Sequence, residues 1–240
     1  DGRFVASGFA QAGPIAARVV TTRRGPIDIE LVVQRLEEAA ALRTRVIDGI
    51  DAGTDAYRLV HGEGDGLPGV VIDVYAGWAV VKYDGDAPER ALGAHVLAAL
   101  ERVRPDLRGV LVRRGRGESK ASVLVRGVPA PRPILVHEHG MKLLSDLDEG
   151  QKTGLFLDHR ESRLRVRGLC QGARVLNLYG YVGGFSIAAG LGGARSVETV
   201  DVAAPAIRLA EAAWKENGLD PALHRGIASD VPARTEALRD

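Results

Sequence analysis

A glycine-rich turn carries the most chemically informative pattern in this sequence. The segment is Val175-Leu-Asn-Leu-Tyr-Gly-Tyr-Val-Gly-Gly-Phe-Ser186, in which an apolar run leads directly into Gly180, Gly183 and Gly184. Glycines at such a turn let a ligand approach the backbone, and the N-terminus of a following helix offers free N–H groups to polar ligand atoms. The pattern predicts a binding site at this turn.

Two carboxylates are expected at the ends of the next two strands. Asp201 follows Asn177 by 24 residues, where an acid can accept hydrogen bonds from both ribose hydroxyls of a nucleoside. Asp230 comes just after a third apolar run, where a carboxylate can reach an adenine amino group. Polar groups at three successive strand ends predict a nucleoside-containing cofactor.

The spacing of the glycines separates two classes of cofactor. It is not G-x-G-x-x-G, so a nicotinamide dinucleotide loses its main support. Cofactors without a pyrophosphate need no such fingerprint, and S-adenosylmethionine is the commonest of them. Glycines that merely close a strand–helix turn are the alternative, which the placement of Asp201 disfavours. The predicted cofactor is S-adenosylmethionine.

The elements that must position these groups alternate between helix and strand from about residue 158. Such alternation is typical of a parallel sheet with right-handed crossovers. The expected order is helix His159 to Arg167, strand Arg174 to Leu178, helix Gly184 to Leu191, strand Ser196 to Asp201, helix Pro205 to Glu216 and strand His224 to Ala228.

The preceding residues predict a strand-rich α+β arrangement, with a domain boundary at about residues 130 to 146. Asp28 is expected to cap a helix that runs to about Val46, and Ala87 to Val103 forms a second helix. The expected strands are Arg3 to Phe9, Ile15 to Thr21, Tyr57 to Val60, Val70 to Tyr75, Trp78 to Tyr83, Val110 to Arg113, Ser122 to Arg126, Ile134 to Val136 and Met141 to Leu144.

Composition narrows the class of protein. The chain is 45% hydrophobic and 26% charged, which is typical of globular proteins, and it has no run of roughly 18 apolar residues. We therefore expect no membrane contact and a cytoplasmic location. The single cysteine, Cys170, agrees with this location, because it cannot form a disulfide within the chain and disulfides are rare in the reducing cytoplasm. The histidines show no metal-ligand spacing. Since the net charge is only +1, any basic surface must be local.

Two groups of basic residues predict contact with nucleic acid. One group surrounds a Gly-Arg-rich loop, and the other lines the helix that precedes the first parallel strand. Glycines between the charges suit close approach to a phosphate backbone, whereas few aromatics are available for base stacking. A solvated basic face is the alternative. The candidate RNA contacts are Arg113, Arg114, Arg116, Lys120 and Arg163.

Three segments resemble a known family. Gly150-Gln-Lys-Thr-Gly-Leu-Phe-Leu-Asp-His-Arg-Glu-Ser-Arg163 and the turn at residues 175–186 are similar to hallmark segments of the RlmI-type large-subunit ribosomal RNA methyltransferases, and residues 57–69 resemble their central domain. The resemblance implies the closing strands of a PUA barrel at 1–24 and an α+β RNA-binding domain at 25–135. Residues 136–240 would form an incomplete Rossmann-like class I methyltransferase domain.

The resemblance also implies roles for individual residues. Asn177, Tyr179, Gly180 and Gly183 would lie along the methionine and ribose of S-adenosylmethionine, Asp201 would hold the ribose hydroxyls and Asp230 would lie by the adenine. Phe156, Asp158 and Arg160 would form a lid. Asn177, Gly180 and Val182 replace the family's usual Asp, small polar residue and Thr. We therefore expect cofactor binding, with reduced affinity.

The implied activity is methyl transfer to carbon 5 of a ribosomal RNA cytosine. That reaction needs a thiolate, and Cys170 precedes the first parallel strand, where we expect a small buried side chain. No catalytic residue is assigned, because the family's Asp-Pro-Pro-type motif and later cysteine are expected beyond Asp240. A guanine-N7 or other base-nitrogen enzyme and a catalytically incomplete fragment are alternatives. Ribosomal RNA is the expected partner, and a homodimer stays open.

Overall fold

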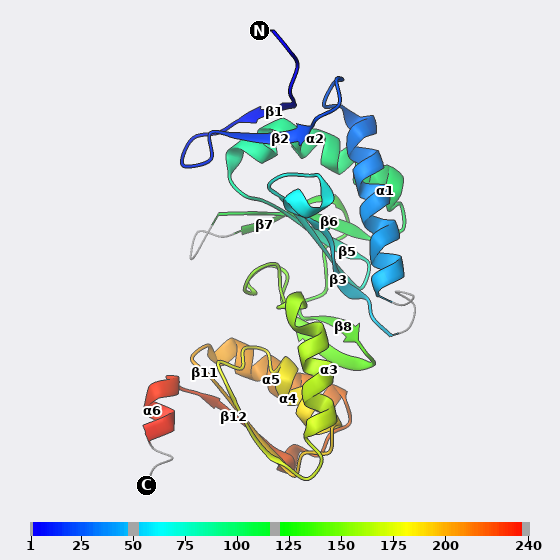
Figure 1. The fold of residues 1–240 in the computed structure, drawn as a ribbon. Helices are drawn as coiled ribbons and strands as arrows, with labels where there is room; N and C mark the ends of the chain where they lie inside the picture. Colours follow the sequence, from blue (N-terminus) through cyan, green and yellow to red (C-terminus); the bar gives the residue numbers. More distant parts are fainter. Residues whose placement is uncertain (1, 48–52, 116–120, 237–240) are drawn as a thin grey trace. The chain divides into compact units, whose positions relative to one another are not determined.

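The computed structural model describes residues 2–47, 53–115 and 121–236. The chain divides into two compact units, Asp1–Ile50 with Tyr57–Ala130 and Asp51–Ala56 with Pro131–Asp240. Each unit is described by itself (Figure 1). The short stretch before Tyr57 joins the second unit because Asp55 accepts hydrogen bonds from the backbone N and from Nδ1 of His137, at 2.6 and 2.8 Å.

The first unit is built on a five-stranded sheet in the order β3-β4-β5-β6-β7. Strands β5 and β6 pair in parallel, whereas β4–β5 and β6–β7 are antiparallel. The parallel connection runs through helix α2 (Asp86–Val103). The strands are β3 (Ala56–His61), β4 (Val70–Tyr75), β5 (Trp78–Tyr83), β6 (Gly109–Arg114) and β7 (Ala121–Gly127).

Helix α1 (Ile29–Val46) lies beside α2, and both pack on the sheet. Asp28 caps α1 as predicted, since its Oδ1 accepts a hydrogen bond from the backbone N of Leu31 at 3.1 Å. Leu36 of α1, Val96 of α2 and Ile72 of β4 are fully buried in the shared core. Burial of each such side chain contributes roughly 1.5–3 kcal/mol to folding.

The N-terminal hairpin is shorter than expected. Strands β1 (Ser7–Ala10) and β2 (Ala17–Thr21) pair antiparallel, with Ser7 opposite Thr21. Residues 3–6 lie beyond the end of the partner strand and have no ladder to join, so the predicted strand from Arg3 was too long. Arg18 ties β2 to the rest of this unit through ion pairs with Asp84, at 2.6 Å, and with Glu63.

The second unit holds a three-stranded parallel sheet in the order β10-β11-β12. Strands β10 (Arg174–Leu178), β11 (Ser196–Asp201) and β12 (His224–Ala228) have the predicted bounds. Asn177, Thr199 and Gly226 stand in register across them. The carboxyl ends of all three strands therefore meet at one edge of the sheet.

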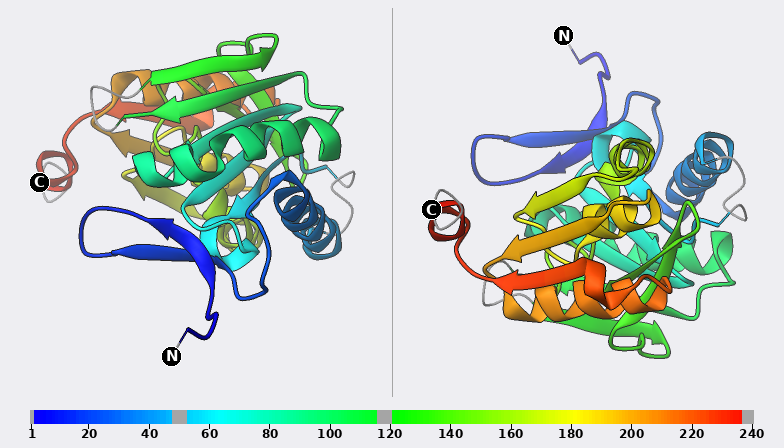
Figure 2. Two further views of the ribbon diagram at one scale, coloured as in Figure 1. Left: turned by 90° about the horizontal axis from the view of Figure 1, so that it is seen from above. Right: turned by 90° about the horizontal axis from the view of Figure 1, so that it is seen from below.

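Helices α4 (Gly184–Leu191) and α5 (Ala204–Glu216) cover the same face of this sheet (Figure 2). Ser186 of α4 bonds to Thr199, and Ile207 of α5 lies against Gly226. Helix α3 (Arg160–Leu169) packs on α4, and the hairpin β8 (Ile134–Glu138) and β9 (Met141–Ser145) packs through β9 on α4 and α5. A short α6 (Val231–Glu236), which the sequence did not predict, follows β12. Among the described helices, none is long and apolar enough to cross a membrane.

Candidate functional site

The turn after β10 adopts a backbone that L-residues rarely adopt. Tyr179 and Tyr181 have φ angles of 54° and 49°, and Gly183, the N-cap of α4, has φ 76°. A non-glycine residue in this region costs about 1–3 kcal/mol and persists only where its surroundings hold it. Here the backbone N of Gly180 donates to the carbonyl of Val200 at 2.9 Å. Tertiary contacts therefore maintain the turn in a strained form.

Two glycines of the turn are required by close approach. A Cβ at Gly180 would lie 2.5 Å from Cγ2 of Thr199, and one at Gly183 would lie 2.6 Å from Cβ of Ala210. Both distances are shorter than side chains tolerate. The turn is therefore drawn tightly onto β11 and α5, which leaves its outer side open.

Asp201, at the end of β11, forms a hydrogen bond with the backbone of the same turn. Its Oδ2 accepts a hydrogen bond from the backbone N of Tyr181, and its Oδ1 accepts one from the N of Ala203, both at 2.9 Å. The residue is 8% exposed. Each carboxylate oxygen has a second lone pair, so Asp201 can still accept hydrogen bonds from a ligand.

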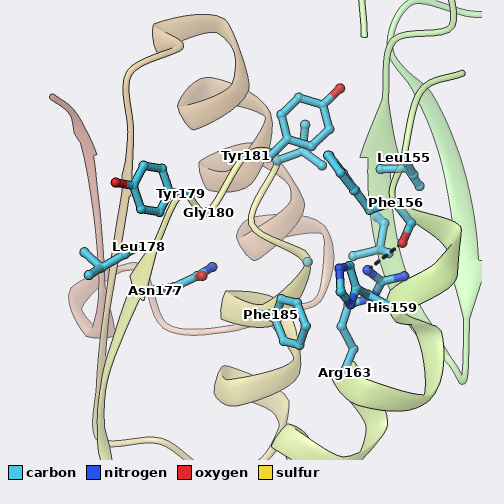
Figure 3. A pocket seen from close by; sticks show the side chains of 13 residues that line it. Leu155, Phe156, His159, Arg163, Asn177, Leu178, Tyr179, Gly180, Tyr181 and Phe185 are labelled. Atoms are coloured by element: carbon cyan, nitrogen blue, oxygen red, sulfur yellow. Dashed lines mark hydrogen bonds between the residues drawn. The ribbon is translucent and has the colours of Figure 1, made fainter. Parts of the chain in front are cut away.

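A cavity of about 300 Å³ opens beside the turn (Figure 3). Its size lies at the lower end of the range for small-molecule sites. The turn and the start of α4 form one wall, and residues 155–163 form the opposite wall. The lining residues are Leu143, Leu155, Phe156, His159, Arg163, Asn177, Leu178, Tyr179, Gly180, Tyr181, Val182, Gly184 and Phe185.

Aromatic rings from both walls surround this cavity. Phe156 meets Tyr181 edge-on with ring centroids 5.7 Å apart, and His159 meets Phe185 at 5.6 Å in the same manner. Figure 3 shows these four rings around the space next to Asn177. Such walls suit the apolar faces and methylene groups of an organic ligand.

Tyr181 joins the two walls. Its hydroxyl donates to the carbonyl of Gly154 at 3.0 Å and accepts from the backbone N of Gln151 at 2.7 Å. Its own backbone N is held by Asp201. One residue therefore couples the carboxylate of β11, the glycine turn and the segment that carries Phe156.

Arg163 is a structural residue of the wall. Its Nε donates to Oε1 of Glu138 at 2.7 Å, its Nη2 also bonds to that carboxylate, and its Nη1 donates to the carbonyl of Phe156 at 3.1 Å. Arg163 is 4% exposed and Glu138 is fully buried. The structure therefore does not favour the expected contact of Arg163 with RNA, because its charge is buried and already paired.

The expected lid residues are placed differently from one another. Phe156 lines the cavity, whereas Asp158 and Arg160 are not among its lining residues. Asp158 bonds to Nζ of Lys152 at 3.1 Å, and Arg160 bonds to Glu161 at 2.7 Å. Partial burial raises the pKa of Asp158, but the hydrogen bond and charge of Lys152 together with a backbone hydrogen bond outweigh it and hold the pKa below its usual value.

The end of β12 lies next to Asp201. The backbone N of Ser229 donates to the carbonyl of Asp201 at 3.0 Å, and the exposed Asp230 follows directly. Of the predicted cofactor residues, Phe156, Asn177, Tyr179 and Gly180 line the cavity. Asp201 and Gly183 support its turn, and Asp230 lies at the neighbouring strand end.

The first basic group is only partly described. Arg113 is buried and its Nε donates to Oγ of Ser122 at 3.2 Å, so the structure does not favour its expected contact with RNA. Arg114 is half exposed and pairs with Glu89, with Nε to Oε1 at 2.9 Å. Arg116 and Lys120 lie outside the described residues.

Three wall residues were missed by sequence reasoning. Tyr181, Phe185 and His159 all lie inside the two segments that define the site, but no role was predicted for them. The signal was present, because an aromatic residue inside a ligand-binding turn must point either into the core or toward the ligand. Both segments that the sequence analysis singled out line the cavity.

The expected burial of Cys170 is confirmed. It is 5% exposed, and burial raises the pKa of its thiol. It follows α3, at the end of β10 away from the glycine turn. A buried thiol of raised pKa is a poor nucleophile at neutral pH. Among the described residues, no group of three or more His, Cys, Asp or Glu is arranged to hold a metal ion.

Comparison with known proteins adds independent findings. A family model described as S-adenosylmethionine-dependent methyltransferase matches residues 92–226. A ribosomal RNA large subunit methyltransferase I from Salmonella arizonae is 36% identical over 247 residues, which cover 100% of this chain and 60% of that protein. The chain thus spans about three-fifths of the length of the curated relatives it matches.

Two solved structures share the fold. A protein from Streptococcus mutans described as a SAM-dependent methyltransferase superposes with a TM-score of 0.86 and 25% identity, over 98% of this chain and 61% of its own. A methyltransferase solved in complex with SAH gives a TM-score of 0.88 and 26% identity over the same shares of the two chains.

Proposed function

The chain belongs to the S-adenosylmethionine-dependent methyltransferases. We propose that its glycine turn binds S-adenosylmethionine. We further propose that the protein methylates large-subunit ribosomal RNA at cytosine carbon 5. The single observation that carries the proposal is the cavity between the turn and the Phe156 wall, with Asp201 beneath it. The relatives' names support the RNA class.

The residues at the cavity fit the cofactor. Asn177, Tyr179, Gly180 and Gly183 would lie along its methionine and ribose. The remaining lone pairs of Asp201 would accept hydrogen bonds from the ribose hydroxyls. Asp230 would lie by the adenine amino group. The cofactor supplies an activated methyl group, and the protein's part is to hold and orient it in a site with little water.

The wall at Phe156, Asp158 and Arg160 would cover the bound cofactor. Phe156 already borders the cavity, and its backbone is fixed by Arg163. Asp158 pairs with the exposed Lys152, and Arg160 pairs with its neighbour Glu161. Such pairs are worth about 0–1 kcal/mol and can exchange for ligand contacts. We propose that both residues turn to the ligand when it binds.

The first unit would grip the RNA. We assign residues 1–24 to the closing strands of a PUA-like domain and 25–135 to an α+β RNA-binding domain. Arg114, Arg116 and Lys120 are the proposed phosphate contacts, whereas Arg113 and Arg163 are buried and are not proposed as contacts. The proposed location is the cytoplasm. A homodimer stays a prediction that sedimentation analysis would test.

Nucleoside mass spectrometry of large-subunit ribosomal RNA tests this function. Cells that lack the gene should lose 5-methylcytidine at one position, and the intact gene should restore it. Unchanged 5-methylcytidine would contradict the proposal. Loss of a methylguanosine instead would favour a base-nitrogen methyltransferase.

A further inference from the structure

Four polar side chains form a continuous hydrogen-bonded chain beneath the glycine turn. Nδ2 of Asn177 donates to Oγ of Ser186 at 2.8 Å, and that oxygen lies 2.6 Å from Oγ1 of Thr199. Oγ1 of Thr199 lies 2.7 Å from Nε2 of His224. The chain thus runs from the cavity wall at β10 through α4 and β11 to β12.

Register explains why these residues meet. Asn177 and Thr199 are opposite each other, and His224 is opposite Val197, two residues before Thr199. Side chains two residues apart on a strand share a face, so all three point toward α4 and α5. Ser186 points down from the first turn of α4.

Because the two hydroxyls are buried, the hydrogen bonds of this series can run in only one of two directions. Ser186 and Thr199 are fully buried, and within the described part of the chain their hydroxyls have no partners besides those named. A buried hydroxyl must donate its hydrogen, and each one here has two partners, so it donates to one of them and accepts from the other. All hydroxyls must therefore point the same way along the chain.

In one direction, Asn177 donates to Ser186, Ser186 to Thr199 and Thr199 to Nε2 of His224. This direction requires a neutral imidazole with its proton on Nδ1. It also leaves Oδ1 of Asn177, which lines the cavity and has no partner among the described residues, as an acceptor for a ligand. In the other direction His224 donates, and the amide of Asn177 would present its NH₂ group to the cavity.

The amide of Asn177 favours the first direction, because its Nδ2 is the atom that faces Oγ of Ser186, and the surroundings of His224 are compatible with this direction. The imidazole is half buried and stacks on the indole of Trp214 with ring centroids 4.6 Å apart and planes 14° apart. Burial lowers its pKa, and no charged side chain contributes to that shift. The ring is therefore neutral at physiological pH and available as an acceptor at Nε2.

We propose that His224, acting through Thr199 and Ser186, is a positioning residue that turns the carbonyl oxygen of Asn177 toward the cofactor. The proposal rests on the proposed cofactor site. Its chemistry suits an N–H or O–H donor, such as the ammonium group of the methionine moiety. The side-chain amide of asparagine has a donor, the NH₂ group, and an acceptor, the carbonyl oxygen. The hydrogen bonds from Asn177 through Ser186 and Thr199 to His224, here called the relay, engage the NH₂ group. The side chain can then act as an acceptor in place of a carboxylate.

The tautomer of His224 tests the relay without any ligand. In nitrogen-15 spectra of the imidazoles, with His224→Gln for assignment, His224 should carry its proton on Nδ1. In Asn177→Asp both carboxylate oxygens accept, so Ser186 must donate to residue 177 and the relay reverses. The proton should then move to Nε2 of His224. The same tautomer in both proteins, or an Nε2 proton in the unmodified chain, would overturn the proposal.

Affinity for S-adenosylhomocysteine provides the second arm. Thr199→Val breaks the relay and should weaken binding roughly fivefold, since one net hydrogen bond is at stake, whereas Thr199→Ser should retain affinity. In the Asn177→Asp background, Thr199→Val should have little effect, because a carboxylate needs no orienting. An equal loss of affinity on Thr199→Val in the unmodified chain and in Asn177→Asp would mean that Thr199 has a merely structural role and would contradict the proposal. If the unmodified chain binds no S-adenosylhomocysteine, the cofactor proposal fails, but the tautomer result still stands by itself.

Discussion

The carboxylate of Asp201 holds the backbone of Tyr181, whose N–H donates to Oδ2 at 2.9 Å. The hydroxyl of the same tyrosine donates to Gly154 on the opposite wall of the cavity. The acid proposed to bind the ribose thus also fixes the turn and, through Tyr181, the segment that carries Phe156. Ligand binding at Asp201 should therefore be felt in both walls.

Asp201→Ala should weaken S-adenosylhomocysteine binding by roughly 1.5–3 kcal/mol, because it removes charged acceptors and loosens the turn. Calorimetry measures the loss, and Glu216→Ala, an exposed acid on α5, serves as the matched control. A nicotinamide dinucleotide that binds more tightly than S-adenosylhomocysteine would contradict the assignment.

Tyr181→Phe keeps the ring contact with Phe156 but removes the hydrogen bonds that join the hydroxyl to Gly154 and Gln151. Each is worth about 0.5–1.5 kcal/mol, so residues 151–156 should open more readily. Hydrogen exchange should rise in that segment, while β10 and β11 stay protected. Unchanged exchange would show that Tyr181 does not couple the two walls.

Arg163→Ala should destabilise the fold by about 3–5 kcal/mol, because it leaves the buried Glu138 without its counter-charge. Denaturant unfolding measures this effect, and Arg165→Ala, an exposed arginine on the same helix, should change little. If Arg163 instead acts on RNA, its replacement would lower the salt dependence of RNA binding without a loss of stability.

Simultaneous replacement of Arg114, Arg116 and Lys120 by alanine should flatten the dependence of RNA affinity on salt. Loss of three phosphate contacts reduces the slope of log affinity against log salt by roughly 2–3. The control removes equal charge at exposed Arg195, Arg208 and Arg225 of the second unit. Equal flattening in both variants would place the RNA track elsewhere.

Cys170→Ala should leave methylation of ribosomal RNA nearly unchanged in cells that carry the otherwise intact gene. Burial raises the pKa of the Cys170 thiol, so little of it is present as the reactive thiolate at neutral pH. Nucleoside mass spectrometry measures the product. Abolished transfer in a folded variant would mean that Cys170 takes part in the chemistry.

Local patterns were sufficient to predict much of this fold. The bounds of β4, β5, β10, β11, β12 and α4 agree with the predicted ranges, because β-rich runs and glycines mark their ends. The attachment of residues 53–56 to the second unit was not predictable, since it depends on Asp55 meeting His137 far along the chain.

In the site, too, local sequence patterns predicted some features, whereas others depend on contacts between distant residues. The two segments that form its walls were predicted, together with Asn177, Gly180 and Phe156. The burial of Arg163 was not, because a cation on a helix faces inward only if a partner such as Glu138 waits there, and helix periodicity does not reveal the partner. Which aromatic rings face the cavity likewise depends on the backbone of the turn.

Hydrogen–deuterium exchange with and without S-adenosylhomocysteine tests the central claim most directly, because it locates the ligand on the chain. The account predicts protection of Leu178–Phe185 and Gly154–His159 together, along with the end of β11 at Asp201. Saturable binding with protection confined to other segments, and none in these, would contradict it.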